Sequence, residues 1–383
     1  MIAFGVHGFE PTVDRAQLGP LGKAMGNPGQ CLAVSPLEGD PNTLFKEYRP
    51  GQLTAADEER LRWLVELPSR LSELDRDFLL SHAAWPVSRV TEGGRTVGVL
   101  IPLAPDRFYE RITDPYGSQR MPLILDHLAM PDRELPLIGL CEPDLELRLD
   151  VCGEILTVAG FFERQGLVYG DWGYQNIFWS QRDSSVYFID VDGCSFGPQA
   201  WVESFGFEDS LTPQSAQVDE HTERFRCAVV VAACLTGEKH PSAAVKALTT
   251  LAGQHPRLQA VANAVRGNID AVSRAGRASI AEMLALLPTD LSEPFEPSGS
   301  RDFQAPGEST ATARPICGGD NIEGWEEVEP APSAGGPASG TGSPATWPNS
   351  ARLDRIRTVQ LRAALVLTAL AALAVLIIVL AAN

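Results

Sequence analysis

The sequence predicts an α+β fold built of two lobes, a small β-rich lobe followed by a larger helical lobe. Short apolar stretches separated by glycine-containing turns dominate residues 18–104, where a single stretch has helical periodicity. Residues 145–165 instead place apolar side chains at helical spacing. Residues 167–193 then combine a strand, a polar turn, a β-hairpin and a second strand, with carboxylates at the strand ends. This order of elements divides the folded part of the chain into residues 18–104 and residues 105–290.

The chain begins with residues 1–17, which have no clear period and form either a tail or an extra strand. Glycine punctuates the apolar residues 18–36, as expected of a hairpin whose backbone passes close to a ligand. Residues 43–46, Thr-Leu-Phe-Lys, then form a short strand that carries one lysine, Lys46. A lone lysine on a strand is usually solvated, so Lys46 is informative only together with the polar residues further along the chain.

One helix of the first lobe is expected over residues 54–67. Thr54 gives a helix start signal, and acidic residues follow in the first turn. Leu61, Leu64 and Val65 recur at helical spacing and predict the buried face.

Two further strands are expected at residues 85–91 and 96–101, joined by a glycine turn, and they complete the β-rich lobe. Residues 106–142 are rich in proline, glycine and charge, so only short helices are expected there. Residues 145–165 form a long helix that leads into residues 167–193.

Four polar side chains of this last stretch stand at strand ends: Asp171, Asn176, Asp190 and Asp192. Phosphoryl transfer to a hydroxyl needs such a set, because one carboxylate orients the acceptor hydroxyl while an amide and another carboxylate hold magnesium. An isolated Asp-x-x-x-x-Asn spacing is common by chance. The turn, the hairpin and the second carboxylate in this order are a more specific signal.

In this order of elements, the stretch resembles the catalytic core of the protein-kinase-like superfamily, which includes eukaryotic-type protein kinases and small-molecule antibiotic kinases. The resemblance implies that Asp171 is the catalytic base, Asn176 a metal ligand and Asp190 the metal-binding aspartate of the Asp-Phe-Gly element. Asp192 occupies the glycine position of that element, so a register in which Asp192 is the metal ligand stays open. Asp190 is preferred because it directly follows the apolar strand.

The resemblance also implies ATP and Mg²⁺ as cofactors. Gly26 and Gly29 match a Gly-rich loop over the ATP phosphates, and Lys46 matches the strand lysine that holds the α- and β-phosphates. The helix glutamate that pairs with this lysine is expected to be Glu59. Glu66 is the alternative, because the two glutamates lie seven residues apart on the same helix face.

The sequence departs from the family pattern at several positions. Ala24 replaces the first glycine of the loop, and Leu44 stands where a small residue usually lines the adenine. Gly170 replaces the arginine before the catalytic base, and Glu223 replaces the aspartate of the helix beneath the catalytic loop. The segment after residue 193 lacks an Ala-Pro-Glu closure.

Net charge and cysteine content limit the classes of partner and the cellular compartment. A formal net charge of −18 argues against a nucleic-acid partner, because binding phosphates requires a basic face. The seven cysteines are odd in number and contain no C-x-x-C, so we interpret them as buried thiols of a reducing compartment.

The C-terminal part of the chain differs in character from the rest. Residues 291–350 contain nine Pro, nine Gly and eight Ser, which predicts a disordered acidic linker. Residues 351–383 combine four arginines with an apolar run at 363–382, which as a helix measures about 30 Å and matches the hydrocarbon core. This predicts a single transmembrane helix at the cell membrane, with residues 1–350 in the cytoplasm.

The sequence and the resemblance, which covers about residues 18–290, predict a membrane-tethered phosphotransferase. It would move the γ-phosphate of ATP to a Ser or Thr hydroxyl of a protein. A small-molecule kinase and a pseudokinase scaffold at the membrane are the alternatives. The expected partners are ATP, an unidentified protein substrate and the lipid bilayer.

Overall fold

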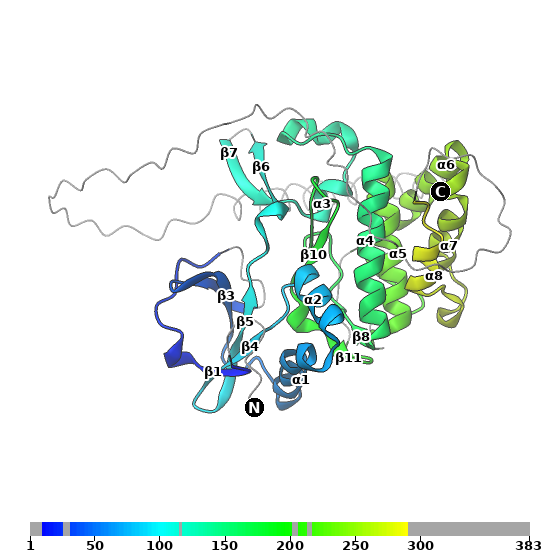
Figure 1. Cartoon of the computed structure of the whole chain (residues 1–383). Helices are drawn as coiled ribbons and strands as arrows, with labels where there is room; N and C mark the ends of the chain where they lie inside the picture. Colours follow the sequence, from blue (N-terminus) through cyan, green and yellow to red (C-terminus); the bar gives the residue numbers. More distant parts are fainter. Residues whose placement is uncertain (1–9, 26–30, 115–116, 201–205, 213–216, 290–383) are drawn as a thin grey trace, which may run out of the picture. The chain divides into compact units, whose positions relative to one another are not determined.

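The computed structural model describes residues 10–25, 31–114, 117–200, 206–212 and 217–289 (Figure 1). The predicted linker and the predicted transmembrane helix lie outside these residues. By its internal contacts the chain divides into Met1–Gly319 and Asp320–Asn383, and every described residue belongs to the first unit. Within the described part, no helix is long and apolar enough to cross a membrane.

The first lobe is a five-stranded sheet with the strand order β1-β4-β5-β3-β2. Strand β1 runs parallel to β4, and the other neighbours are antiparallel. The strands predicted from the sequence are therefore present, and the N-terminal stretch, expected as a tail or an extra strand, contributes β1. The strands are β1 (Thr12–Asp14), β2 (Cys31–Leu37), β3 (Asp40–Tyr48), β4 (Ser88–Glu92) and β5 (Arg95–Pro102).

The glycine-rich stretch before β2 begins as a hairpin. The amide of Gly22 donates to the carbonyl of Pro36 at 2.8 Å, and the amide of Met25 donates to the carbonyl of Val34 at 2.7 Å. Residues 21–25 thus run alongside β2. Gly26 and Gly29, the predicted phosphate-loop glycines, lie outside the described residues.

Helix α1 (Ala55–Glu66) matches the helix predicted in the first lobe. Its N-terminus is closed by a capping box, in which Thr54 accepts from the amide of Asp57 and Asp57 accepts from the amide of Thr54. Helix α2 (Glu73–His82) follows and has no counterpart in the sequence prediction. Its only fully buried residue is Leu79, so its sequence lacks a wide apolar stripe.

The second lobe is mainly helical, as predicted. In Figure 1, α4 and α5 run side by side, and α5 also packs against both α6 and α7. The long helix expected at residues 145–165 is α4. The helices are α4 (Leu145–Arg164), α5 (Glu220–Thr236), α6 (Pro241–Gln254), α7 (Gln259–Ile269) and α8 (Ile280–Ala285).

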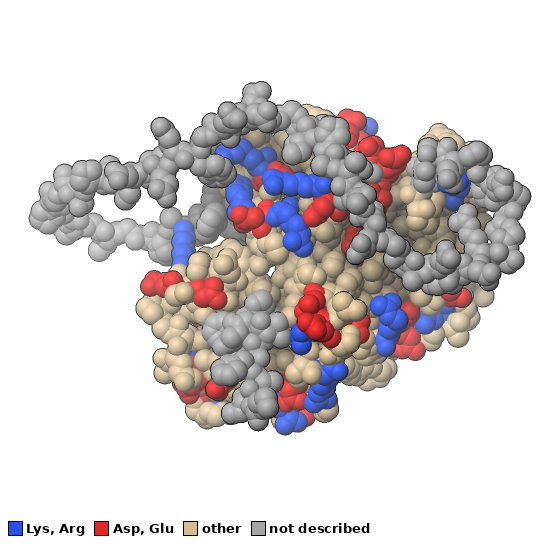
Figure 2. Space-filling model, viewed as in Figure 1, with Lys and Arg blue, Asp and Glu red and all other residues tan. Residues whose placement is uncertain are grey.

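Between the lobes in sequence, the prediction of only short helices is incomplete. A short helix α3 (Leu125–Leu128) is present, but β6 (Tyr109–Asp114) and β7 (Gly117–Pro122) also form an antiparallel pair. Figure 2 shows Lys and Arg side chains gathered over this hairpin and mixed with carboxylates. One of these contacts is the ion pair of Arg120 with Asp106, at 2.8 Å.

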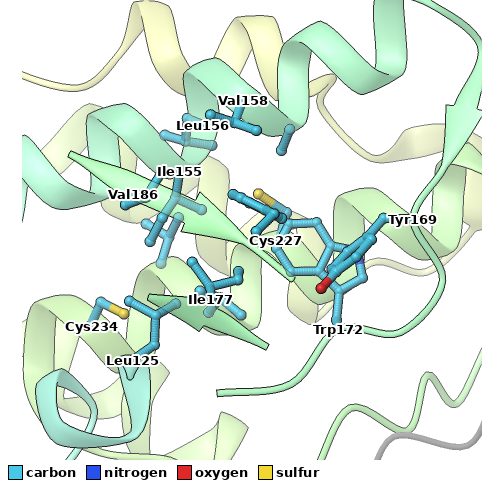
Figure 3. Close-up of a cluster of buried hydrophobic side chains, with 14 of the residues drawn as sticks. Leu125, Ile155, Leu156, Val158, Tyr169, Trp172, Ile177, Val186, Cys227 and Cys234 are labelled. Atoms are coloured by element: carbon cyan, nitrogen blue, oxygen red, sulfur yellow. The ribbon is translucent and has the colours of Figure 1, made fainter. Parts of the chain in front are cut away.

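Four short strands frame the candidate site: β8 (Leu167–Val168), β9 (Ile177–Trp179), β10 (Val186–Phe188) and β11 (Ser195–Phe196). Strands β9 and β10 form the predicted hairpin, and β8 pairs with β11. Figure 3 shows side chains of this region, among them Tyr169, Ile177 and Val186, packed with residues of α4 and α5. The structure describes six of the cysteines, and five of these six are buried.

Candidate active site

The loop between β8 and β9 carries two of the predicted site residues, Asp171 and Asn176. The amide of Asn176 donates to the carbonyl of Gly173 at 3.0 Å, and its side-chain Nδ2 donates to the carbonyl of Asp171 at 2.9 Å. Because Nδ2 is used within the loop, the side-chain oxygen Oδ1 of Asn176 is the atom left for a ligand. The loop thereby holds Asp171 and Asn176 in one fixed arrangement.

Glu223 of α5 supports this loop from beneath, and its side chain is buried. Its carboxylate accepts hydrogen bonds from the amide of Tyr169 at 2.9 Å, the amide of Gly170 at 3.2 Å and Nε1 of Trp172 at 2.8 Å. Burial raises the pKa of Glu223, although these donors and the nearby Arg226 oppose the rise. The glutamate at the family's aspartate position therefore still holds the loop.

Gly170 is required by the backbone. Its φ is +78°, in the left-handed region that favours glycine. A Cβ atom at this position would lie 1.9 Å from Nε2 of Gln199. A side chain at this position would therefore strain the backbone and displace the end of the Gln199 side chain.

Asp190 and Asp192 lie just after β10, and Lys46 of β3 reaches both. Nζ of Lys46 lies 3.0 Å from Oδ1 of Asp190 and 2.7 Å from Oδ1 of Asp192. Asp190 has a left-handed backbone, with φ of +57°, and its side chain is 44% exposed, whereas that of Asp192 is 7% exposed. The fold thus brings Lys46 to two predicted site residues that are more than 140 positions away in the chain.

Asp192 has two further partners that the sequence did not suggest. The hydroxyl of Tyr48 donates to its Oδ2 at 2.6 Å. The guanidinium of Arg60 on α1 donates to the backbone carbonyls of Asp192 at 2.6 Å and Cys194 at 3.2 Å. Tyr48 lies two residues after Lys46, hence on the same face of β3, which is the signal that could have identified it.

The predicted pairing of Lys46 with a glutamate of α1 is wrong in this structure. Glu59 instead pairs with Arg62 and accepts from Nε1 of Trp63 at 3.0 Å. The alternative, Glu66, pairs with Arg70 at 2.6 Å. The glutamates share a helix face, as expected, but that face points to solvent, since Leu61, Leu64 and Val65 form the buried one.

The charged side chains of the site shift one another's pKa values. Burial and the neighbouring Asp190 carboxylate raise the pKa of Asp171, while Lys46 and Arg226 oppose the rise. Burial by itself would lower the pKa of Lys46, but the carboxylates of Asp192 and Asp190 raise it above its ordinary value. Lys46 therefore stays charged.

The donor set fits a magnesium ion that is completed by a nucleotide. Among the described residues, no group of three or more His, Cys, Asp or Glu side chains could hold a metal alone. Asp190 offers a half-exposed carboxylate and Asn176 an amide oxygen. Mg²⁺ usually takes one or two carboxylates plus substrate phosphates, so these residues could hold it together with ATP.

A pocket of about 650 Å³ lies beside Asp171 and Asn176. Aromatic walls are formed by Tyr174 and Phe207, whose ring centroids are 5.1 Å apart. Three carboxylates, one lysine and a histidine also line it: Asp126, Asp171, Glu208, Lys239 and His240. Lys239 is paired with Asp126 at 2.7 Å.

The position expected to line the adenine is occupied by a large side chain, that of Leu44. Leu44 on β3 lies opposite Ile101 on β5 in the strand register. Both side chains are buried in the same apolar cluster as Cys31. The substitution of a leucine for a small residue thus fills space in the folded protein.

Of the comparisons with known proteins, only the one with solved structures gives matches. No protein-family model matches the chain, and no curated protein matches it. The 1782 matching chains of solved structures include the ROP18 kinase domain in complex with AMP-PNP and sucrose. That match has 12% sequence identity and a TM-score of 0.46, and it covers 69% of this chain and 76% of the other. The sheet that carries Lys46, helix α1 and the loop with its hairpin follow one another in the order predicted from the sequence.

Proposed function

We propose that this protein is a Mg²⁺- and ATP-dependent phosphotransferase that transfers the γ-phosphate to a hydroxyl group. The observation that carries the proposal is the convergence of Lys46 on the carboxylates of Asp190 and Asp192. The loop that bears Asp171 and Asn176 lies in the same electrostatic environment, because Lys46 and Asp190 both act on the carboxyl of Asp171.

Each of these residues has a role in the proposed reaction. Lys46 binds the α- and β-phosphates, and Asp190 with Asn176 binds the metal. A bound Mg²⁺ supplies charge neutralisation of the phosphates. Asp171 orients the acceptor hydroxyl and accepts its proton, and a raised pKa brings its basicity closer to that of a general base working near neutral pH.

The first candidate acceptor is a Ser or Thr hydroxyl of a protein. A small hydroxyl-bearing molecule is the second candidate, and the pocket beside Asp171 favours it, since its volume of about 650 Å³ is typical of small-molecule sites. Three carboxylates and one lysine line that pocket, which leaves a net charge of about −2 with His240 neutral. Either acceptor should therefore carry a positive charge near its hydroxyl.

Tethering to the cytoplasmic face of the cell membrane is part of the proposal and rests on the apolar run at residues 363–382. A membrane-bound pseudokinase scaffold is the competing function. The buried Leu44 side chain, at the position expected to line the adenine, favours that alternative.

Nucleotide binding separates the enzyme from the scaffold. The full-length protein should be stabilised against heat by ATP, and more strongly by ATP with Mg²⁺ than by ATP with a chelator. Transfer of labelled phosphate should then be measured with a basic Ser/Thr peptide and with small amino alcohols as acceptors. Absence of any stabilisation by ATP with Mg²⁺ or Mn²⁺ would leave the scaffold as the function.

A further inference from the structure

Asp192 has no free side-chain oxygen in the described structure. Its Oδ1 accepts from Lys46 at 2.7 Å, its Oδ2 accepts from Tyr48 at 2.6 Å, and its backbone carbonyl accepts from Arg60 at 2.6 Å. The side chain is 7% exposed. A metal at this carboxylate would compete with Lys46 and Tyr48 at a buried position.

Asp190 differs in each of these respects. It is 44% exposed, and its contact with Lys46 is longer, at 3.0 Å. Its left-handed backbone turns the chain immediately after β10. The two aspartates are thus an accessible carboxylate and a buried, fully engaged one.

Helix α1 contacts the backbone of Asp192 through the guanidinium of Arg60. Arg60 bonds the carbonyls of Asp192 and Cys194, and its guanidinium is also paired with Asp57 of the same helix at 3.3 Å. Glu59 and Glu66 are engaged by arginines of their own helix. The contact from α1 to Lys46 therefore runs through Arg60 and Asp192.

We propose that Asp192 is the positioning residue for Lys46, in place of a helix glutamate, and that Asp190 remains for the metal. Asp192 supplies the anion that keeps the Lys46 ammonium at the phosphate site, and Tyr48 and Arg60 fix Asp192. The expected effects on nucleotide binding rest on the proposed function. The contact between Asp192 and Lys46 is independent of that function.

The test compares matched Asp→Asn variants of the full-length protein by thermal shift, using a non-hydrolysable ATP analogue with EDTA and then with Mg²⁺. Asp192→Asn should lose most of the metal-free shift, as Lys46→Met should, and keep the further shift caused by Mg²⁺. Asp190→Asn should keep most of the metal-free shift and lose the further shift caused by Mg²⁺. Glu59→Gln and Glu66→Gln should match the unmodified protein in both conditions.

A second measurement needs no nucleotide. The rate at which a small acylating reagent modifies Lys46 is followed by mass spectrometry in the same variants. Asp192→Asn should raise this rate above that of Glu59→Gln and Glu66→Gln, because Lys46 loses its shorter ion pair. Tyr48→Phe, which keeps every charge, should raise it to a smaller extent, and it remains informative if Asp192→Asn does not fold.

The outcomes are distinct. If Asp192→Asn loses the Mg²⁺-dependent shift while Asp190→Asn keeps it, the two aspartates have the opposite roles. If either glutamine variant loses the metal-free shift, a helix glutamate holds Lys46 once nucleotide binds, and the inference is overturned. If no nucleotide shifts the unmodified protein, the proposed function fails, whereas the acylation rates still decide whether Asp192 holds Lys46.

Discussion

Asp171 illustrates how one side chain depends on its surroundings. It lies in a loop whose amides are held by Glu223 and whose Asn176 bonds its carbonyl. These contacts fix the position of the carboxylate to which the proposed reaction assigns the acceptor hydroxyl. Asp171→Asn should therefore retain nucleotide binding and lose transfer.

The expected loss of transfer is about 10²–10⁴-fold, the usual contribution of a general base. The measurement is single-turnover transfer beside the thermal shift with ATP and Mg²⁺. A variant that loses nucleotide binding in proportion to transfer would contradict this role for Asp171.

Glu223 gives a second prediction at this scale. Its two oxygens accept from three N–H donors, and a glutamine offers only one oxygen, so its NH₂ group would face at least one of these donors. Glu223→Gln should cost about 1–3 kcal/mol in the free energy of unfolding, the cost of an unsatisfied buried group. Urea unfolding measures it, with the half-exposed Glu66→Gln as the control. Equal effects of the two changes would show that Glu223 does not carry the loop.

The sequence predicted Lys46, Asp171, Asn176 and Asp190 as site residues from their chemistry and order, and the structure brings Lys46 into contact with Asp190 and Asn176 into contact with Asp171. The sequence prediction misplaced Glu59. Seven-residue spacing indicates that two glutamates share a face, but not that the face is buried. At about 100° per residue, Glu59 lies roughly opposite the apolar side chains of α1, which is the signal that could have excluded it.

Among the elements, the described residues 206–212 are joined to the helical lobe by a buried ion pair. Asp209 pairs with the guanidinium of Arg277 through bonds of 2.6 and 2.7 Å, and each side chain is 1% exposed. Thr212 also donates to Asp209 at 2.6 Å. This pair anchors a segment for which the sequence contains no Ala-Pro-Glu closure.

Asp209→Asn should destabilise the protein by about 3–5 kcal/mol, because it leaves the Arg277 charge buried without its anion. Denaturant unfolding of the full-length protein measures the change. The surface pair of Arg120 and Asp106 provides a control, since Asp106→Asn at a largely exposed carboxylate should cost less than about 1 kcal/mol. A cost at Asp209 as small as that of the control would contradict the anchor.

The same pair predicts a dependence on pH. Burial by itself would raise the pKa of Asp209, but hydrogen bonds from Arg277 and Thr212 lower it below its ordinary value of 3.8. A lowered carboxyl pKa stabilises the fold above the ordinary value, and this contribution is lost as the pH falls through the folded-state pKa. The unfolding free energy should therefore fall more steeply in acid for the unmodified protein than for Asp209→Asn. If the unfolding free energies of the two proteins fell in parallel with pH, Asp209 would not be a source of the pH dependence.

Elements differed in how well the sequence predicted them. Helices α1 and α4 each have a clear apolar face, and periodicity identified them. Helix α2 and the β6–β7 hairpin bury few side chains, and the hairpin strands carry charged residues such as Arg111 and Arg120. Without a buried face there is no periodic pattern to detect, so tertiary contacts determine these elements.

At the scale of the whole molecule, the proposal of a membrane tether makes one direct prediction. Deletion of residues 361–383 should move the protein from the membrane fraction to the supernatant without changing its melting temperature. The reason is that the deleted run supplies the apolar length needed to span a bilayer, while the described residues contain no such helix. Fractionation after a high-salt wash measures it. A truncated protein that still pellets would indicate another mode of membrane attachment.

The engagement of Asp192 also has a consequence for motion. The bonds from Lys46 and Tyr48 join strand β3 to the turn after β10, and they converge on one side chain. Separating the sheet from that turn therefore requires both bonds to break, together with the contact of Lys46 with Asp190. Relaxation-dispersion NMR on the amides around these residues should detect a single exchange process with a common rate, and Tyr48→Phe should accelerate it.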